Sequence, residues 1–377
     1  MNQVIKRCLQ SLAPWVLGGL TWMAASVVSA QGADYILQQN SASFTQVPAR
    51  EPASAPAVAP IAGSDLPGFA VAKVRIGLLL PLSSPALGEA ADVVRQGFNA
   101  AREVDGRSDT AVVEAVFADE AEALPAYRNL IAQGANVVVG PLTRTGISRI
   151  ATQVSVPTLA LNSLEGLPLR PKLYALSLSV DAEAKQIAAM MADNGHRRPL
   201  LIYGADGLSQ RLRQTFAGVW QIKRGALPLQ LAMDEAHGAA LDAALAQSDS
   251  VFLALPGAEA ALARSVLPQA LPAYATSTLN VRESLPTLSG VRFVDMPWLL
   301  MPDHPAVRAY PRPAHSLTVA TERLYALGID AYRLAQRLAT QKNLSGLRLD
   351  GVSGDLRLGR DQQFQRTLPV WVRGELQ

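Results

Sequence analysis

The sequence predicts an α/β fold of two Rossmann-like lobes, each built around a mainly parallel sheet. From residue 73 onward, short apolar runs alternate with amphipathic runs of helical period, and the connections between them are short. Such alternation is typical of a parallel sheet covered by helices on both faces. The alternation occurs in two successive sets, and the chain is longer than one hydrophobic core usually supports. Both observations favour two lobes.

Residues 1–30 have the pattern of a cleavable signal peptide. Lys6 and Arg7 form a basic start, an apolar stretch follows over residues 12–28, and Ala30 ends a small-residue cleavage site. We therefore expect this segment to be removed and the protein to reside in the periplasm. We expect no stable membrane insertion after that removal.

Cys8 is the only cysteine, and it precedes the apolar stretch, whereas a lipid-modified cysteine would end it. We therefore expect no lipid anchor. A chain without residues 1–30 would contain no cysteine, which excludes disulfides and thiolate chemistry. Loss of Lys6 and Arg7 lowers the formal net charge from +3 to +1, because no acid precedes residue 31. Such a near-neutral protein has no electrostatic reason to bind nucleic acid.

Residues 31–72 are predicted to form a linker rich in proline and alanine. They show no hydrophobic period. Segments of this composition are extended, semi-rigid spacers.

The first set of elements begins with a buried strand at residues 74–80. A loop rich in serine and proline follows it, and then a helix over residues 90–105. The next expected elements are a strand at 110–117, a helix at 120–133, a strand at 137–139, a helix at 145–153 and strands at 157–161 and 174–178.

The second set begins with a helix at residues 181–194. It continues with strands at 199–203, 227–231, 250–255, 273–276 and 291–294, and with helices at 209–224 and 258–267. A strong amphipathic helix at 321–338 and a β-rich end follow. We expect discontinuous lobes: residues 73–178 with 299–348, and residues 179–298 with 349–377.

Several loops resemble those of the type 1 periplasmic binding-protein fold, which branched-chain amino-acid receptors use. The resembling segments are LPLSS at residues 80–84, GPLT at 140–143, PTLALNS at 157–163 and the tail over 351–374. This resemblance implies two lobes that are joined by several crossings of the chain.

Three stretches resemble the penicillin-binding protein activator family more narrowly. They are ERLYALGIDAYRLAQRL at residues 322–338, FVDMPWLL at 293–300 and the tail beginning SGDLRLGRDQQFQRTLP at 353. The resemblance implies a non-catalytic periplasmic regulator that docks on a class A penicillin-binding protein and stimulates peptidoglycan cross-linking. The alternative is a soluble solute-binding receptor for an ABC importer or a sensor, with an amino acid or amide-like ligand.

Three residue pairs that follow predicted strands are candidates to line a cleft between the lobes. They are Ser83 with Ser84, Leu142 with Thr143, and Asn162 with Ser163. Free backbone N–H groups before a helix, beside hydroxyl groups, suit a carboxylate ligand. The same residue types also cap helices, so a structural role remains the alternative. In amino-acid receptors, the positions that resemble Thr143 and Ser163 often hold the ligand's carboxylate and ammonium.

Asp206 is the candidate from the second lobe. Amino-acid receptors often present Tyr-Gly where this chain reads Ala205-Asp206-Gly207-Leu208, so the aromatic lid of those receptors is missing here. Asp206 could bind an ammonium group, or it could cap the helix that follows.

Four further residues are predicted to have structural roles near the crossings. Asp295, Pro297 and Trp298 lie where the chain is expected to pass between the lobes, where proline stiffens the backbone and tryptophan packs a large apolar surface. Asp330 lies in the amphipathic helix and is expected to hydrogen-bond across the fold.

The sequence carries no recognisable catalytic machinery. The four histidines (196, 237, 304 and 315) lack metal-ligand spacing, and no nucleophile elbow, P-loop or dinucleotide fingerprint is present. We therefore expect no enzyme activity, no metal and no cofactor.

Overall fold

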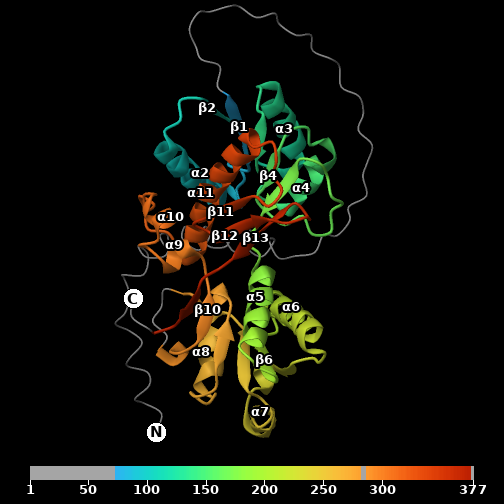
Figure 1. The fold of residues 1–377 in the computed structure, drawn as a ribbon, viewed down its shortest axis with the longest axis vertical. Coiled ribbons are helices and arrows are strands. Elements are labelled where there is room, and N and C mark those ends of the chain that lie inside the picture. Colours follow the sequence, from blue (N-terminus) through green and yellow to red (C-terminus); the bar gives the residue numbers. More distant parts are fainter. Residues whose placement is uncertain (1–72, 282–285, 375–377) are drawn as a thin grey trace, which may run out of the picture.

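The computed structural model describes residues 73–281 and 286–374, which form two lobes stacked along the long axis of the molecule (Figure 1). The first lobe is built on a sheet of eight strands and the second on a sheet of six. The expected two-lobed α/β architecture is therefore confirmed. The predicted signal peptide and linker, residues 1–72, lie outside the described residues.

The first sheet begins as a parallel sheet. Its parallel strands are β1 (Val74–Leu80), β2 (Thr110–Val116), β3 (Val137–Val139), β4 (Thr158–Ala160) and β5 (Leu173–Leu176). Three more strands extend it: β13 (Gln363–Thr367), which is parallel to β5, and then β12 (Asp355–Leu358) and β11 (Arg348–Asp350), which are joined to it by antiparallel pairing. The spatial order is β11-β12-β13-β5-β4-β3-β1-β2, so β2 forms one edge.

Helices cover the first sheet. They are α2 (Gly88–Asp105), α3 (Ala123–Ala132), α4 (Arg144–Ile150), α9 (Pro297–Leu300), α10 (Pro305–Arg308) and α11 (Val319–Thr340), with 3-10 turns η1 (Glu120–Glu122) and η2 (Ala151–Gln153). The long helices α2 and α11 cross with their backbones in contact. A side chain at Gly97 would overlap the carbonyl oxygen of Tyr325, and one at Gly328 would overlap that of Val94. Glycine at these two positions is what lets the helices approach so closely.

The second sheet has the spatial order β14-β10-β9-β8-β6-β7. Its strands are β6 (Pro199–Tyr203), β7 (Leu229–Ala232), β8 (Ser250–Ala254), β9 (Ala273–Ala275), β10 (Arg292–Val294) and β14 (Val370–Val372). Only β14 is antiparallel to its neighbour. The covering elements are α5 (Val180–Asp193), α6 (Gly207–Arg224), α7 (Gly238–Leu245) and α8 (Gly257–Ser265), with 3-10 turns η3 (Met233–Glu235), η4 (Ser277–Leu279) and η5 (Pro286–Leu288).

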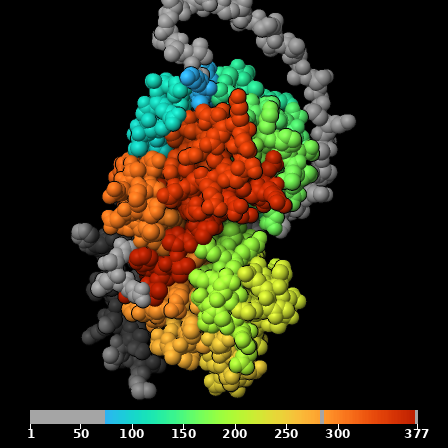
Figure 2. Space-filling view, viewed as in Figure 1, coloured from blue at the N-terminus to red at the C-terminus, as the bar shows by residue number. Residues whose placement is uncertain are grey.

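The strand order corrects the expected placement of residues 349–377 in the second lobe. Strands β11 to β13 belong to the first sheet, and only β14 joins the second. The reason is that β13 pairs with β5, with Phe364 opposite Leu176, and that Phe364 of β13 and Leu356 of β12 are buried in the core of the first lobe. Figure 2 shows this C-terminal segment lying over the first lobe and reaching down to the second.

The chain passes between the two sheets at three places in its described part: from β5 to α5, from β10 to α9 and from β13 to β14. These crossings form the junction between the lobes. In the described residues, no helix combines the length and the apolar character that a bilayer crossing requires.

Candidate ligand cleft and lobe junction

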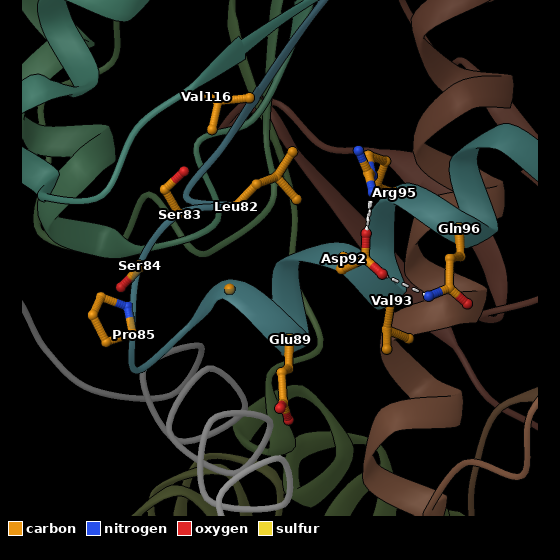
Figure 3. Close-up of a pocket in the computed structure, with 11 residues that line it drawn as sticks. Leu82, Ser83, Ser84, Pro85, Glu89, Asp92, Val93, Arg95, Gln96 and Val116 are labelled. Atoms are coloured by element: carbon orange, nitrogen blue, oxygen red, sulfur yellow. Dashed lines mark hydrogen bonds and ion pairs between the residues drawn. The ribbon is translucent and has the colours of Figure 1, made fainter.

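Ser83 and Ser84 line an open pocket of about 680 Å³ beside the start of α2 (Figure 3). The exposed Ser83 is held by its backbone N–H, which donates to the carbonyl of Phe117 at 3.2 Å. On the opposite wall, Asp92 accepts hydrogen bonds from Arg95 and Gln96. The pocket offers hydroxyl groups on one side, while Asp92 and Arg95 on the other side already pair with each other.

The other two predicted pairs are buried and hydrogen-bonded inside the protein. Thr143 caps α4, since its Oγ1 accepts from the N–H of Gly146 at 3.2 Å. Asn162 Nδ2 donates to the carbonyl of Leu142 at 3.1 Å, and its Oδ1 accepts from the N–H of Ser163 at 2.8 Å. The hydroxyl of Ser163 donates to Gln363 Oε1 at 3.3 Å. These contacts fasten the loops to one another, and a ligand contact remains a prediction.

Asp206 caps α6. Its Oδ1 accepts from the N–H groups of Leu208 and Ser209, both at 3.0 Å. The capping role was one of the two alternatives that the sequence left open. Its second carboxylate oxygen, Oδ2, does not take part in the cap and lies near Gly204.

Charged residues that the sequence did not single out lie between the lobes. On the second lobe, Arg211 Nη2 lies 2.5 Å from Asp181 Oδ2. On the first lobe, Arg144 is buried directly after Thr143 and donates to the carbonyl of Glu165 at 2.9 Å. Burial lowers the pKa of Arg144, and Asp181 and Arg211 act on it electrostatically across the lobes. Burial also raises the pKa of Asp181, against the opposing effect of Arg211.

The lobe junction contains a network of buried ion pairs, of which the sequence predicted only one member, Asp295. This residue follows β10 and forms a bidentate ion pair with Arg323 of α11. Arg323 Nη2 donates to Asp295 Oδ2 at 2.7 Å, and Arg323 Nε donates to Asp295 Oδ1 at 3.2 Å. Asn280 Nδ2 donates to the same carboxylate at 2.8 Å. Arg323 also donates to the carbonyl of Ser277 at 2.9 Å. One carboxylate of the second lobe therefore holds a helix of the first.

A second pair extends this network. Glu183 of α5 lies with its Oε1 3.5 Å from Arg366 Nη2 of β13, and both side chains are buried. The N–H of Ser277 donates to Glu183 Oε2 at 2.9 Å, which connects the two pairs. Burial raises the pKa of Glu183, and the adjacent Arg366 and Ser277 oppose this effect. Burial lowers the pKa of Arg366, and Glu183 opposes this.

Pro297 and Trp298 begin α9, next to the crossing from the second lobe. The indole of Trp298 is fully buried against Tyr325, with ring centroids 5.4 Å apart. The guanidinium of Arg312 lies 4.1 Å from the Trp298 ring centroid. These contacts are the packing role that tryptophan was expected to have.

Asp330 joins α11 to the loop before β12. Its carboxylate accepts from the hydroxyl of Ser353 at 2.7 Å and from the N–H groups of Val352 and Ser353. Arg333 Nη1 lies 2.9 Å from its Oδ1. A side chain at Gly351 would collide with this carboxylate, so the loop depends on glycine there. Asp330 thus makes contacts across the fold.

Comparison with known proteins places these features in a family. The family model described as "LppC putative lipoprotein" matches residues 17–228 and 230–373. The penicillin-binding protein activator LpoA of Yersinia pseudotuberculosis is 26% identical over 411 residues, covering 83% of this chain and 62% of its own. LpoA of Aliivibrio fischeri is 26% identical over 342 residues, covering 80% of this chain and 57% of its own. The chain therefore spans less than two thirds of the length of these relatives.

Solved structures share the fold. A Chromobacterium violaceum protein named as a branched-chain amino acid ABC transporter is 51% identical, with a TM-score of 0.75 over 79% of this chain and 99% of that one. The C-domain of Haemophilus influenzae LpoA, described as a regulator of PBP1A, is 22% identical with a TM-score of 0.64 and shows the fold alone. Because the family model covers most of the sequence, the chain belongs to the LppC family, that of the penicillin-binding protein activators.

Proposed function

We propose that this protein is a non-catalytic periplasmic regulator of peptidoglycan synthesis that binds a class A penicillin-binding protein and stimulates it. The observation that carries the proposal is the family match, which extends over most of the chain. The curated relatives within this family are named as penicillin-binding protein activators. The matching region, residues 17–228 and 230–373, includes almost all of the two-lobed domain.

The contacts between the lobes support a docking role. A transport receptor must open and close about its crossings to take up and release a solute. Here the crossings are fastened by Asp295 with Arg323 and by Glu183 with Arg366, which resist such movement. The hydroxyl and amide groups of Thr143, Asn162 and Ser163 are also used within the protein. A rigid body with occupied cleft groups suits binding to a larger protein.

The test is reconstitution with a class A penicillin-binding protein from the same organism. We expect the purified protein to be retained by the immobilised enzyme and to raise its rate of peptidoglycan cross-linking. An unrelated two-lobed amino-acid receptor is the matched control and should do neither. A lack of both retention and stimulation would reject the proposal.

The second candidate is a soluble solute receptor. It is favoured by the 51% identity to a protein named as a branched-chain amino acid ABC transporter and by the serine-lined pocket beside α2. A thermal-shift screen against amino acids, amides and peptidoglycan fragments separates the two functions. A ligand that binds the native state raises the melting temperature by mass action. A rise of several degrees with an amino acid would favour the receptor, whereas no shift together with stimulation would favour the regulator.

A further inference from the structure

The carboxyl ends of β6 and β8 form a topological switch point in the second sheet. These strands are neighbours, and the chain leaves them in opposite directions, from β6 toward β7 and from β8 toward β9. In open α/β sheets, ligands bind in the crevice at such a point. Gly204 follows β6 here, and the helices α6 and α8 both begin nearby.

Three side-chain oxygens converge on the face of Gly204. A Cβ atom placed on this glycine would lie 2.9 Å from Asp206 Oδ2, 3.0 Å from Glu259 Oε2 and 3.1 Å from Ser209 Oγ. The oxygens therefore face one small volume beside Gly204, where this residue has no side chain of its own. They come from two different helices, Glu259 from α8 and the other two from the start of α6.

The hydroxyl of Ser209 is the feature that the fold does not explain. Its side chain is 1% exposed, and Oγ has no hydrogen-bond partner in the described part of the chain. A buried hydroxyl without a partner destabilises the folded state, and a ligand that pairs with it recovers that free energy. Ser209 Oγ makes no hydrogen bond to either carboxylate, although all three groups face the same volume.

The charges around this volume favour a cation. Asp206 uses only Oδ1 for the helix cap. Neither Asp206 nor Glu259 forms an ion pair with a cationic side chain of the described residues. The amino ends of α6 and α8 each supply roughly half a positive charge, against the two negative charges of the carboxylates. A net negative charge of about one remains. The helix ends alone would account for two acids, but not for the buried hydroxyl aimed at the same volume.

We propose that Asp206, Ser209 and Glu259 bind a small cation, either a primary ammonium group or an oxygen-preferring divalent metal ion. Both kinds of cation are held by carboxylate and hydroxyl oxygens. An ammonium group has three N–H donors for three acceptors. Mg²⁺ typically keeps several water molecules and takes only one or two carboxylates from a protein. This site goes beyond the proposed activation of a penicillin-binding protein and does not depend on it.

The experiment measures cation binding to the full chain by thermal shift and by isothermal titration calorimetry. The probes are methylammonium chloride, MgCl₂ and CaCl₂. Tetramethylammonium chloride at equal ionic strength is the control, because it carries the charge without an N–H donor. We expect saturable binding and a raised melting temperature with methylammonium or with a divalent ion. The probe that responds shows whether the site takes an ammonium group or a metal ion. No response to any of the three probes would overturn the proposal.

Three variants place the binding at this site. Asp206→Asn removes a charge but keeps a good helix cap, because asparagine caps as well as aspartate. Glu259→Gln and Ser209→Ala remove the other two ligands. We expect each to weaken cation binding at least tenfold. The matched control is Asp242→Asn, which removes an exposed carboxylate of α7 in the same lobe and should leave binding unchanged.

Ser209→Ala distinguishes a ligand from a structural group. Without added cation, loss of an unpartnered hydroxyl should leave the melting temperature unchanged or raise it, while the shift caused by the cation is lost. If all three variants keep the cation response of the native protein, the site is wrong. Stimulation of the penicillin-binding protein is measured separately on the same variants, so failure of one proposal is distinguishable from failure of the other.

Discussion

Asp295 and Glu183 each hold an arginine of the opposite lobe, and both carboxylates are buried. A buried ion pair contributes modest net stability, because both charges lose their hydration when the chain folds. Removal of only one partner is different, since it leaves an uncompensated charge in a region of low dielectric constant. The residues of the junction are therefore sensitive to single substitutions and tolerant of paired ones.

Arg323→Ala tests this sensitivity. The substitution leaves Asp295 with Asn280 and the N–H of Met296 as its remaining hydrogen-bond donors. We expect the free energy of unfolding, measured in urea, to fall by about 3–5 kcal/mol. Arg102→Ala at an exposed position of α2 is the control and should change it by less than about 0.5 kcal/mol. Equal effects of the two substitutions would contradict the role assigned to the junction pair.

Tyr332 gives a prediction about alkaline pH. Its hydroxyl donates to Asp105 at 2.6 Å, and burial with this hydrogen bond raises its pKa from 10.0 to about 12. Between these values the unfolded chain loses the proton while the native protein keeps it. The free energy of unfolding therefore falls as pH rises through this range, and the contribution is fully present below pH 10.

The measurement is urea unfolding of the native protein and of Tyr332→Phe at a series of pH values from neutral to alkaline. Phenylalanine removes the titrating group, so the variant should lose less stability at alkaline pH than the native protein does. At neutral pH it should be less stable by about 1–3 kcal/mol, because the hydrogen bond to Asp105 and the one from Gln336 Nε2 are both lost. Parallel pH profiles for the two proteins would show that Tyr332 is not responsible.

At the scale of elements, the crossing of α2 and α11 determines how the first lobe packs. The apolar stripe of Leu324, Leu327, Ala331 and Leu334 could be predicted from its helical spacing, and all four side chains are buried. The spacing alone does not say which helix covers the stripe. That choice depends on Gly97 and Gly328, whose contacts join positions more than two hundred residues apart.

Gly328→Ala should destabilise the protein although alanine is the better helix former. The added methyl group would overlap the carbonyl oxygen of Val94, so the two backbones must separate. Overpacking of this kind costs about 1–3 kcal/mol or more and exceeds the gain of about 1 kcal/mol in helix propensity.

Gly218→Ala in α6 is the matched control. It lies within a helix, and a side chain there meets no atom within 4 Å. This substitution should raise the free energy of unfolding by about 0.5–1 kcal/mol. In urea unfolding, Gly328→Ala should lower the free energy of unfolding and Gly218→Ala should raise it. If both substitutions changed it in the same direction, the close packing of α2 against α11 at Gly328 would be contradicted.

The limits of sequence reasoning are clear in the C-terminal segment. The turns at Gly351, Gly354 and Gly359 and the β-rich character of this segment could be predicted locally. The sheet to which this segment belongs could not be predicted, because the pairing of β13 with β5 joins residues nearly two hundred positions apart. The same holds for Glu183 and Arg366, since no local pattern shows that a helix acid and a strand arginine are buried together.

At the scale of the whole molecule, the crossings and the junction ion pairs join the lobes into one structure. Each lobe has its own sheet, so each could unfold separately if the junction were weak. The network from Asp295 and Glu183 to α11 and β13 opposes this, because unfolding of one lobe would expose charged groups that the other still holds. We therefore expect the native protein to unfold in a single cooperative transition.

Arg366→Met tests whether the ion pairs produce this cooperativity. The substitution leaves Glu183 buried without its charged partner at the surface where the lobes meet. Differential scanning calorimetry should show one transition for the native protein, with equal calorimetric and van't Hoff enthalpies, and two for the variant. The double substitution Glu183→Leu with Arg366→Met should restore the single transition, because an apolar pair replaces a buried ion pair at little cost. A single transition in Arg366→Met, shifted only in temperature, would mean that the backbone crossings alone couple the lobes.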